Sequence, residues 1–253
     1  MAALRLLSAL VIFSIWASCA SAEYTPKYQR ALAATAPEFP HLDFIWANAE
    51  GDLDGDGLPD LALVLTGNRG ADGPREERLI VLVGKPDGSY KILSVSDEFC
   101  SIRKFYNLST SPLGRSFDVE GVSSGDASHS DSSTLKFRYN VKLNDFELVG
   151  REDRSTNYDE DSSYRVSINY LTGVAIQTRH LGTNYIERRH TDDGTEEIVK
   201  HSRRSSKHKE VKTKFNSTVL FRLQGFNCSR YLDEDPAAIL PIHIDQDFKV
   251  QRK

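Results

Sequence analysis

Apolar and polar side chains alternate along most of this chain, and the alternation predicts β-strands. The pattern is clearest over residues 116–122, 135–141 and 164–171. A period of two places one side of a strand against a core and leaves the other side in water. Short turns separate these segments, so we expect neighbouring strands to pair as an antiparallel meander.

Two runs are apolar at almost every position. Residues 61–65 form an apolar run of strand length, and residues 78–83 predict a buried strand. Residues 85–88 read Lys-Pro-Asp-Gly, which predicts a hairpin turn into a strand at 90–93. Further strands are expected at residues 146–149, 174–178, 185–189, 196–200, 211–215 and 219–223. Thr25 and Pro26 predict the cap and first residue of a short helix before all of these strands.

The expected fold class is therefore all-β. We expect an antiparallel meander or sandwich, or partial propeller-like sheets, with one short N-terminal helix. Residues 23–150 would form a β domain, and residues 151–253 a more polar β-meander extension. The acidic stretch 152–161 is either a linker between two domains or a long hairpin within one domain. Strands as polar as those of the extension must leave one face in water.

Residues 1–22 have the form of a secretory signal peptide. Arg5 precedes an apolar stretch, and Ala20-Ser21-Ala22 is a small-residue cleavage site. This predicts a mature chain that begins at Glu23 and is secreted, either to a periplasm or outside the cell. An alternative makes Cys19 a lipoprotein acceptor, although Trp16 stands where such sites usually have leucine. No later segment is apolar for long enough to form a transmembrane helix.

Two cysteines remain after cleavage, Cys100 and Cys228. An even count in an oxidising compartment favours a disulfide between them. The alternative is two buried thiols, which behave as small hydrophobic groups. The formal net charge of −4 is ordinary for a soluble protein and gives no footprint for nucleic acid.

Residues 52–60 read Asp-Leu-Asp-Gly-Asp-Gly-Leu-Pro-Asp, which concentrates four carboxylates around two glycines. Such charges repel one another unless a hard dication lies between them, and Ca²⁺ takes six to eight oxygen ligands. The aspartates occupy loop positions 1, 3, 5 and 9, and Leu58 at position 7 offers its backbone carbonyl. Gly57 at position 6 permits a sharp turn.

The flanking residues distinguish between two kinds of calcium loop. An EF-hand needs a glutamate at position 12 and a helix on each side, but position 12 is Leu63. Residues 44–47 and 61–65 are apolar and of strand length. Strand–loop–strand therefore fits better than helix–loop–helix.

Residues 51–64 resemble the D-x-D-G-D-G-x-x-D calcium loop of FG-GAP and VCBS-type repeats, which integrin α-subunits and many secreted bacterial proteins carry. The resemblance extends over residues 44–66, and no second full copy is present, whereas a propeller needs at least four blades. It implies a secreted binding or adhesion-type module. It also implies that Ca²⁺ is held by Asp52, Asp54, Asp56, the carbonyl of Leu58, and Asp60. The alternative for this loop is an acidic hairpin without a metal.

Two other polar segments are weaker candidates for a metal. Residues 157–162 have oxygen ligands at alternate positions, but they lack the glycine and place Arg165 at position 9, so a solvated turn is the simpler interpretation. His129 lies near Asp126 and Asp131 in the serine-rich segment 123–133. That segment is expected to be a mobile loop, which cannot pre-organise a site.

Residues 200–214 are basic. One interpretation is a patch for an anionic partner. The other, which we prefer, is a solvated edge strand protected by lysine, since the aromatic residues that stack on nucleic acid are missing. The basic and histidine residues are Lys200, His201, Arg203, Arg204, Lys207, His208, Lys209, Lys212 and Lys214.

The sequence contains no recognised catalytic motif. The function that it favours is a secreted, Ca²⁺-binding β-protein that acts as a binding module, with a saccharide or another cell-surface component as the expected partner. The alternative is a hydrolase of cell-wall or polysaccharide material, or an inhibitor of one. Aspartate and glutamate are abundant enough to supply the carboxylate pair of such a hydrolase.

The cysteine pair gives the first testable prediction. Mature protein digested without reducing agent should yield a cross-linked peptide that contains Cys100 and Cys228. Replacing both by serine should lower the free energy of unfolding by about 4 to 5 kcal/mol, because the bridge would close a long loop. Quantitative alkylation of both thiols in unreduced protein would show that they are free.

Overall fold

The computed structural model describes residues 24–68, 75–97, 99, 105–111, 114–124, 128–190, 196–203, 205–215, 221–227, 242–244 and 249–252. This part of the chain is mostly β-structure with one short helix near the N-terminus, as predicted. Helix α2 covers Pro26–Thr35, and Pro26 is its first residue. The side chain of Thr25 makes no capping hydrogen bond, so that detail of the prediction was wrong. The described strands form no closed barrel.

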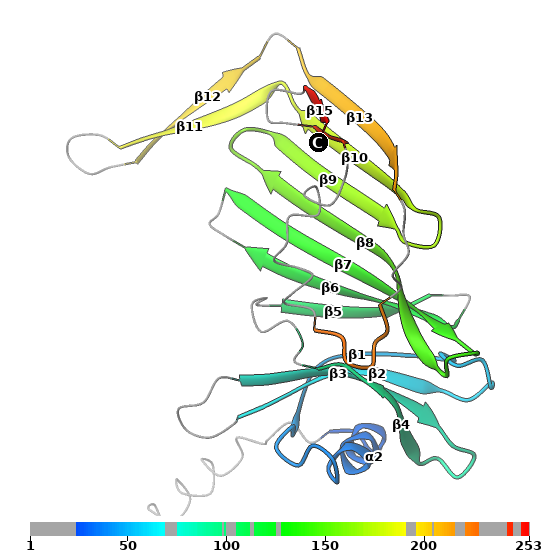
Figure 1. The fold of residues 1–253 in the computed structure, drawn as a ribbon. Helices are drawn as coiled ribbons and strands as arrows, with labels where there is room; N and C mark the ends of the chain where they lie inside the picture. The colour runs from blue at the N-terminus through cyan, green and yellow to red at the C-terminus, as the bar shows by residue number, and fades with distance from the viewer. Residues whose placement is uncertain are drawn as a thin grey trace, which may run out of the picture.

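Two antiparallel sheets hold most of the strands (Figure 1). The four-stranded sheet has the order β1-β2-β3-β4, with strands Phe44–Gly51, Asp60–Asn68, Arg75–Gly84 and Tyr90–Val95. The seven-stranded sheet has the order β13-β10-β9-β8-β7-β6-β5. In chain order its strands are β5 (Phe105–Thr110), β6 (Ser116–Ser124), β7 (His129–Asn140), β8 (Asp145–Asn157), β9 (Ser162–Asn169), β10 (Val174–Leu181) and β13 (Lys207–Lys214).

The four-stranded sheet lies between helix α2 and the seven-stranded sheet (Figure 1). Alternation along β2 explains this position. Leu61, Leu63 and Leu65 pack in the cluster that contains Ala31 of the helix. Ala62 and Val64 pack in the cluster shared with the other sheet. Both faces of β2 are thus buried, which accounts for its continuous apolar run.

Phenylalanines form the centre of the packing between the sheets. Phe117, Phe137 and Phe146 are fully buried, and the rings of Phe117 and Phe137 are stacked at 5.4 Å. Phe226 packs edge-on against Phe137 at 5.4 Å. Two backbone hydrogen bonds to β8 hold the segment 221–227 there. The Phe146 carbonyl accepts one of them, and the Leu148 N–H donates the other.

The second half of the chain continues the same sheet. The acidic stretch 152–161 forms the end of β8 and the turn into β9. One buried cluster includes Ala47 and Phe117 from the first half and Val166 and Ala175 from the second.

The described residues 123–124 and 129–133 lie in strands and not in the loop that their composition predicted. Strand β6 extends to Ser124, and β7 begins at His129 and pairs with both β6 and β8. Serine and threonine side chains are compatible with a strand, and two ladders of backbone hydrogen bonds supply the stability that apolar burial does not.

The basic segment 200–214 is divided between two sheets. Strand β12 (Glu196–Ser202) pairs with β11 (Asn184–His190) in a hairpin that projects from the sheet (Figure 1). Strand β13 forms the edge of the seven-stranded sheet, as the edge-strand interpretation expects. Arg203 lies at the bend between them. The remaining hairpin joins β14 (Ile242–Ile244) to β15 (Val250–Arg252).

The phenylalanine packing gives a prediction about stability. Phe137→Ala should lower the free energy of unfolding by about 3 to 5 kcal/mol, because it removes a buried ring and leaves a cavity. Val141→Ala is the matched control, since Val141 is 65% exposed and should change stability by no more than about 0.5 kcal/mol. Equal effects of the two variants in urea denaturation would contradict this arrangement of the core.

Candidate metal centre

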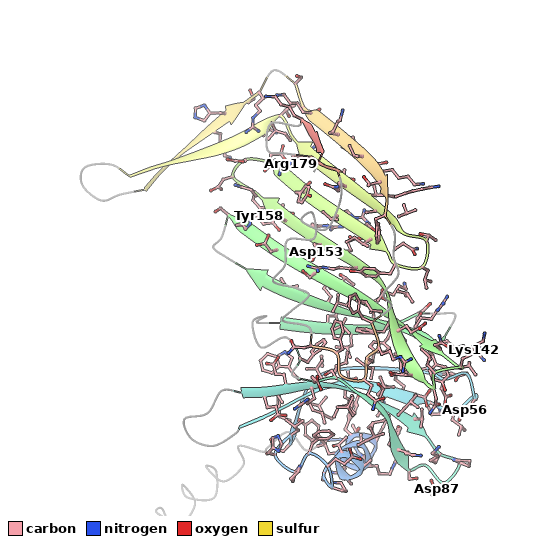
Figure 2. All side chains as sticks on the ribbon, in the orientation of Figure 1. Asp56, Asp87, Lys142, Asp153, Tyr158 and Arg179 are labelled. Atoms are coloured by element: carbon pink, nitrogen blue, oxygen red, sulfur yellow. The ribbon has the colours of Figure 1, made fainter. Side chains whose placement is uncertain are left out.

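The aspartate-rich loop connects β1 to β2 at one end of the four-stranded sheet, where Figure 2 labels Asp56. Gly51 and Asp60 are paired across the two antiparallel strands that enter and leave the loop. The arrangement is strand–loop–strand, as predicted, and the helices of an EF-hand are not present here.

The aspartates shape the loop through hydrogen bonds to its own backbone. Oδ1 of Asp52 accepts from the Gly55 N–H at 2.7 Å, and Oδ1 of Asp54 accepts from the Asp56 N–H at 3.0 Å. Gly55 and Gly57 both have φ of +85°, a conformation that favours glycine. The spacing of aspartates and glycines in the sequence therefore corresponds directly to the turns of the loop.

Asp60 is fully buried. Its Oδ2 accepts from the N–H groups of Leu53 at 2.7 Å and Asp54 at 3.1 Å. Its Oδ1 accepts from the Gly84 N–H at 2.9 Å. Burial raises the pKa of Asp60, and these three donors act in the opposite direction. An ionised carboxylate has about four lone-pair sites, so Asp60 retains acceptor capacity for a cation.

Three of the predicted ligands converge. One carboxylate oxygen from each of Asp52, Asp54 and Asp60 lies within 4.8 Å of the others. Two ligands that are each 2.3 to 2.6 Å from a Ca²⁺ ion lie at most about 5 Å apart, so these oxygens fit around one ion. Asp56 is not part of this group, and its role and that of the Leu58 carbonyl stay predictions.

Arg115 anchors the loop to the seven-stranded sheet, a contact that the sequence analysis did not find. The Arg115 N–H donates to the Asp52 carbonyl at 3.0 Å, and the Arg115 guanidinium lies against Gly55, where it would collide with any added Cβ. Arg115 itself has φ of +57°. The loop also places Leu53, which is fully buried, in the core between the sheets.

The acidic residues of the segment 157–162, all of them described, do not form a metal cluster. Among the described residues, Asp52, Asp54 and Asp60 are the only group of three potential ligands at such distances. His129 uses the same atom, Nε2, to contact Asp131 at 3.2 Å and Ser155 at 3.3 Å, which excludes a serine–histidine–aspartate relay in this conformation. Asp126 and the two cysteines, Cys100 and Cys228, lie outside the described residues.

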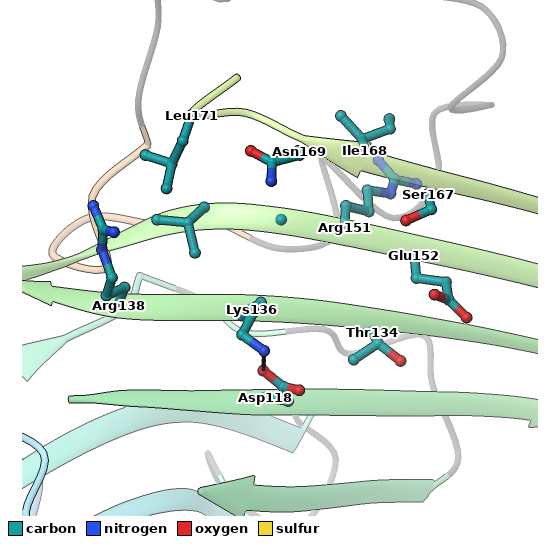
Figure 3. Close-up of a pocket in the computed structure, with 12 residues that line it drawn as sticks. Asp118, Thr134, Lys136, Arg138, Arg151, Glu152, Ser167, Ile168, Asn169 and Leu171 are labelled. Atoms are coloured by element: carbon teal, nitrogen blue, oxygen red, sulfur yellow. Dashed lines mark ion pairs between the residues drawn. The ribbon is translucent and has the colours of Figure 1, made fainter. Parts of the chain in front are cut away.

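A pocket of about 590 Å³ lies on the face of the seven-stranded sheet opposite to the phenylalanines (Figure 3). Asp118 and Glu152 are its two carboxylates. Asp118 pairs with Lys136 at 3.5 Å, and Glu152 pairs with Arg165 at 2.5 Å. In this structure both carboxylates are engaged by cations.

Comparisons of the chain with protein-family models, with curated proteins and with solved structures find no match. The resemblance to FG-GAP and VCBS-type loops therefore depends on residues 51–64 alone. In the part of the chain that the structure describes, no helix is long and apolar enough to cross a membrane.

Gly55 and Gly57 provide a matched pair for testing the loop. Both have φ of +85°, but Gly57 has nothing within 4 Å of an added Cβ. Gly57→Ala should cost about 1 to 2 kcal/mol for the backbone conformation alone. Gly55→Ala should cost more, because Arg115 must also move, and the excess should fall to zero in an Arg115→Ala background. Equal costs in both backgrounds would show that Arg115 does not press on the loop.

Proposed function

We propose that the mature chain is a secreted binding module whose β1–β2 loop holds Ca²⁺. The supporting observation is the convergence of the Asp52, Asp54 and Asp60 carboxylates within 4.8 Å. Three like charges at that separation repel one another in the absence of a cation. All the donors are oxygens, which are the ligands that hard dications such as Ca²⁺ prefer. The pattern of residues 1–22 supports secretion.

Ca²⁺ suits this loop better than Mg²⁺ does. Mg²⁺ demands a near-ideal octahedron at 2.0 to 2.1 Å, whereas Ca²⁺ accepts six to eight oxygens in a flexible geometry. The three converging carboxylates, the predicted contributions of Asp56 and the Leu58 carbonyl, and water would complete such a shell.

The proposed ion would act on the fold rather than on a substrate. The loop that would surround it carries Leu53 into the core and presents the Asp52 carbonyl to Arg115. Ordering the loop therefore orders the contact between the two sheets. An ion enclosed by several protein ligands leaves little room for a substrate, and metal binding of this kind adds to folding free energy.

Thermal melting with and without metal tests the calcium assignment. Ca²⁺ at 100 times its dissociation constant should add about 2.7 kcal/mol to the free energy of unfolding, and Mg²⁺ should add less. Asp54→Asn should abolish the shift. In excess chelator it should melt at the same temperature as the wild type or higher, because it removes one of three repelling charges.

Asp87→Asn is the matched control for this experiment. Asp87 lies in the turn between β3 and β4, is exposed, and does not belong to the carboxylate cluster. Asparagine can keep its hydrogen bond from the Ser89 N–H. This variant should retain the full calcium shift. Identical melting temperatures of the wild type in chelator and in millimolar Ca²⁺ would contradict the proposal that the β1–β2 loop holds Ca²⁺.

A panel of immobilised bacterial cell-wall and capsular polysaccharides separates the module from the hydrolase. The proposal expects mature protein to be retained on at least one polysaccharide without releasing reducing ends. Release of reducing ends that is lost when Asp118 or Glu152 is replaced by its amide would favour the hydrolase. Failure to bind any polysaccharide while the calcium shift persists would leave the metal site intact and exclude saccharides as the partner class.

A further inference from the structure

The phenylalanine-bearing face of the seven-stranded sheet becomes polar toward its far end. Residues paired across neighbouring strands point to the same side of a sheet. Leu135 pairs with Arg151, and Ser133 pairs with Asp153, so these polar side chains share the face of the apolar core. The same face then ends in a pocket of about 440 Å³.

Two rows of paired residues form the floor of this pocket. One row begins at His129 on β7 and continues across the neighbouring strands through Asn157, Ser162 and Leu181. The next row runs through Ser155, Tyr164 and Arg179. The pocket is thus lined by an imidazole, an amide, hydroxyl groups and a guanidinium, which are the donors that oxyanions use in proteins.

Arg179 is the residue that points most directly to a ligand. Its guanidinium lies 5.1 Å from the centroid of the Tyr164 ring. Its Nε is buried and has no hydrogen-bond partner, and no described carboxylate forms an ion pair with it. A partly buried cation without a counter-ion is costly to maintain. An anion in the pocket would supply the missing charge.

Arg151, on the same face, is an arginine whose charge is paired with a carboxylate of the same sheet. Its Nε lies 2.7 Å from Oδ2 of Asp153, and Oδ1 of Asp153 accepts from the Ser133 hydroxyl at 2.6 Å. Among the described residues, the sheet therefore supplies a carboxylate for Arg151 and none for Arg179. Next to Arg179 the row continues into Lys209 on the edge strand, which adds positive charge.

The boundary of the pocket is held in place by Arg203. Its Nη1 donates to the carbonyl of Glu160 at 2.8 Å and lies 3.4 Å from the carbonyl of Gly182. These contacts tie the bend between β12 and β13 to the turn between β8 and β9. Among the residues that line the pocket, Glu160 is the one carboxylate and Arg179 and Arg203 are the cations. At its border the Asp131 carboxylate lies 3.2 Å from Nε2 of His129.

We propose that this pocket binds a small oxyanion, sulfate or phosphate, with the guanidinium of Arg179 as the principal donor. The planar fork of arginine matches two oxygens of such an anion, and the Tyr164 ring holds the guanidinium in position. Figure 2 shows Arg179 and Asp56 at opposite ends of the molecule, so this site is independent of the calcium loop.

Titration calorimetry of mature protein with sodium sulfate tests the proposal, with sodium chloride at equal ionic strength as the blank. Sulfate should bind saturably, at one site. Arg179→Gln should weaken the binding at least tenfold, and Arg179→Lys should weaken it several-fold, because lysine keeps the charge but not the planar fork. Arg154→Gln is the matched control, because Arg154 is 55% exposed and pairs with Glu152; its affinity should equal that of the wild type.

The absence of saturable sulfate binding by the wild type would overturn the proposal, and so would undiminished binding by Arg179→Gln. If Arg179→Gln does not melt cooperatively, Arg179→Lys decides in its place, and unchanged affinity in that variant would count against the site. General stabilisation by sulfate is not saturable and would be equal in all variants. Dextran sulfate distinguishes the source of the anion: tighter binding per sulfate group indicates a sulfated polymer, and equal binding indicates the free ion.

Discussion

The buried carboxylate of Asp60 is the interaction on which the rest of this structure depends. Its two oxygens accept hydrogen bonds from the N–H groups of Leu53 and Asp54 in the loop and of Gly84 on β3. Because burial disfavours its charge, Asp60 is stable as a carboxylate only while those donors stay in place. The same donors fix the loop that directs Leu53 into the core between the two sheets.

Local features of the sequence predicted the parts of the fold and site that depend on near neighbours. The spacing of aspartate and glycine predicted a strand–loop–strand with a carboxylate cluster, and the structure brings Asp52, Asp54 and Asp60 together. Alternation predicted which side chains of β7 face the core, including Phe137. The apolar run 78–83 predicted that this part of β3 would be buried.

Features that depend on distant pairing could not be predicted in this way. Arg115 reaches the aspartate-rich loop because a turn of the other sheet packs there, and nothing in its local sequence marks it. The segment 221–227 is held by β8, far away in the chain. The serine-rich segment 123–133 was wrongly expected to be a loop. Its composition indicates that few side chains can be buried, but it does not reveal the backbone hydrogen bonds that neighbouring strands provide. Arg179 became a candidate only once its row of neighbours was known.

Equilibrium dialysis against radioactive Ca²⁺ tests the central claim most directly, because it counts bound ions rather than inferring them from stability. The mature protein, first freed of metal with chelator, should retain one ion per chain at saturation. Asp54→Asn should retain none, although its amide oxygen can still accept the Asp56 N–H that shapes the loop. Retention of no ion by the wild type at millimolar Ca²⁺, or undiminished retention by Asp54→Asn, would contradict the account.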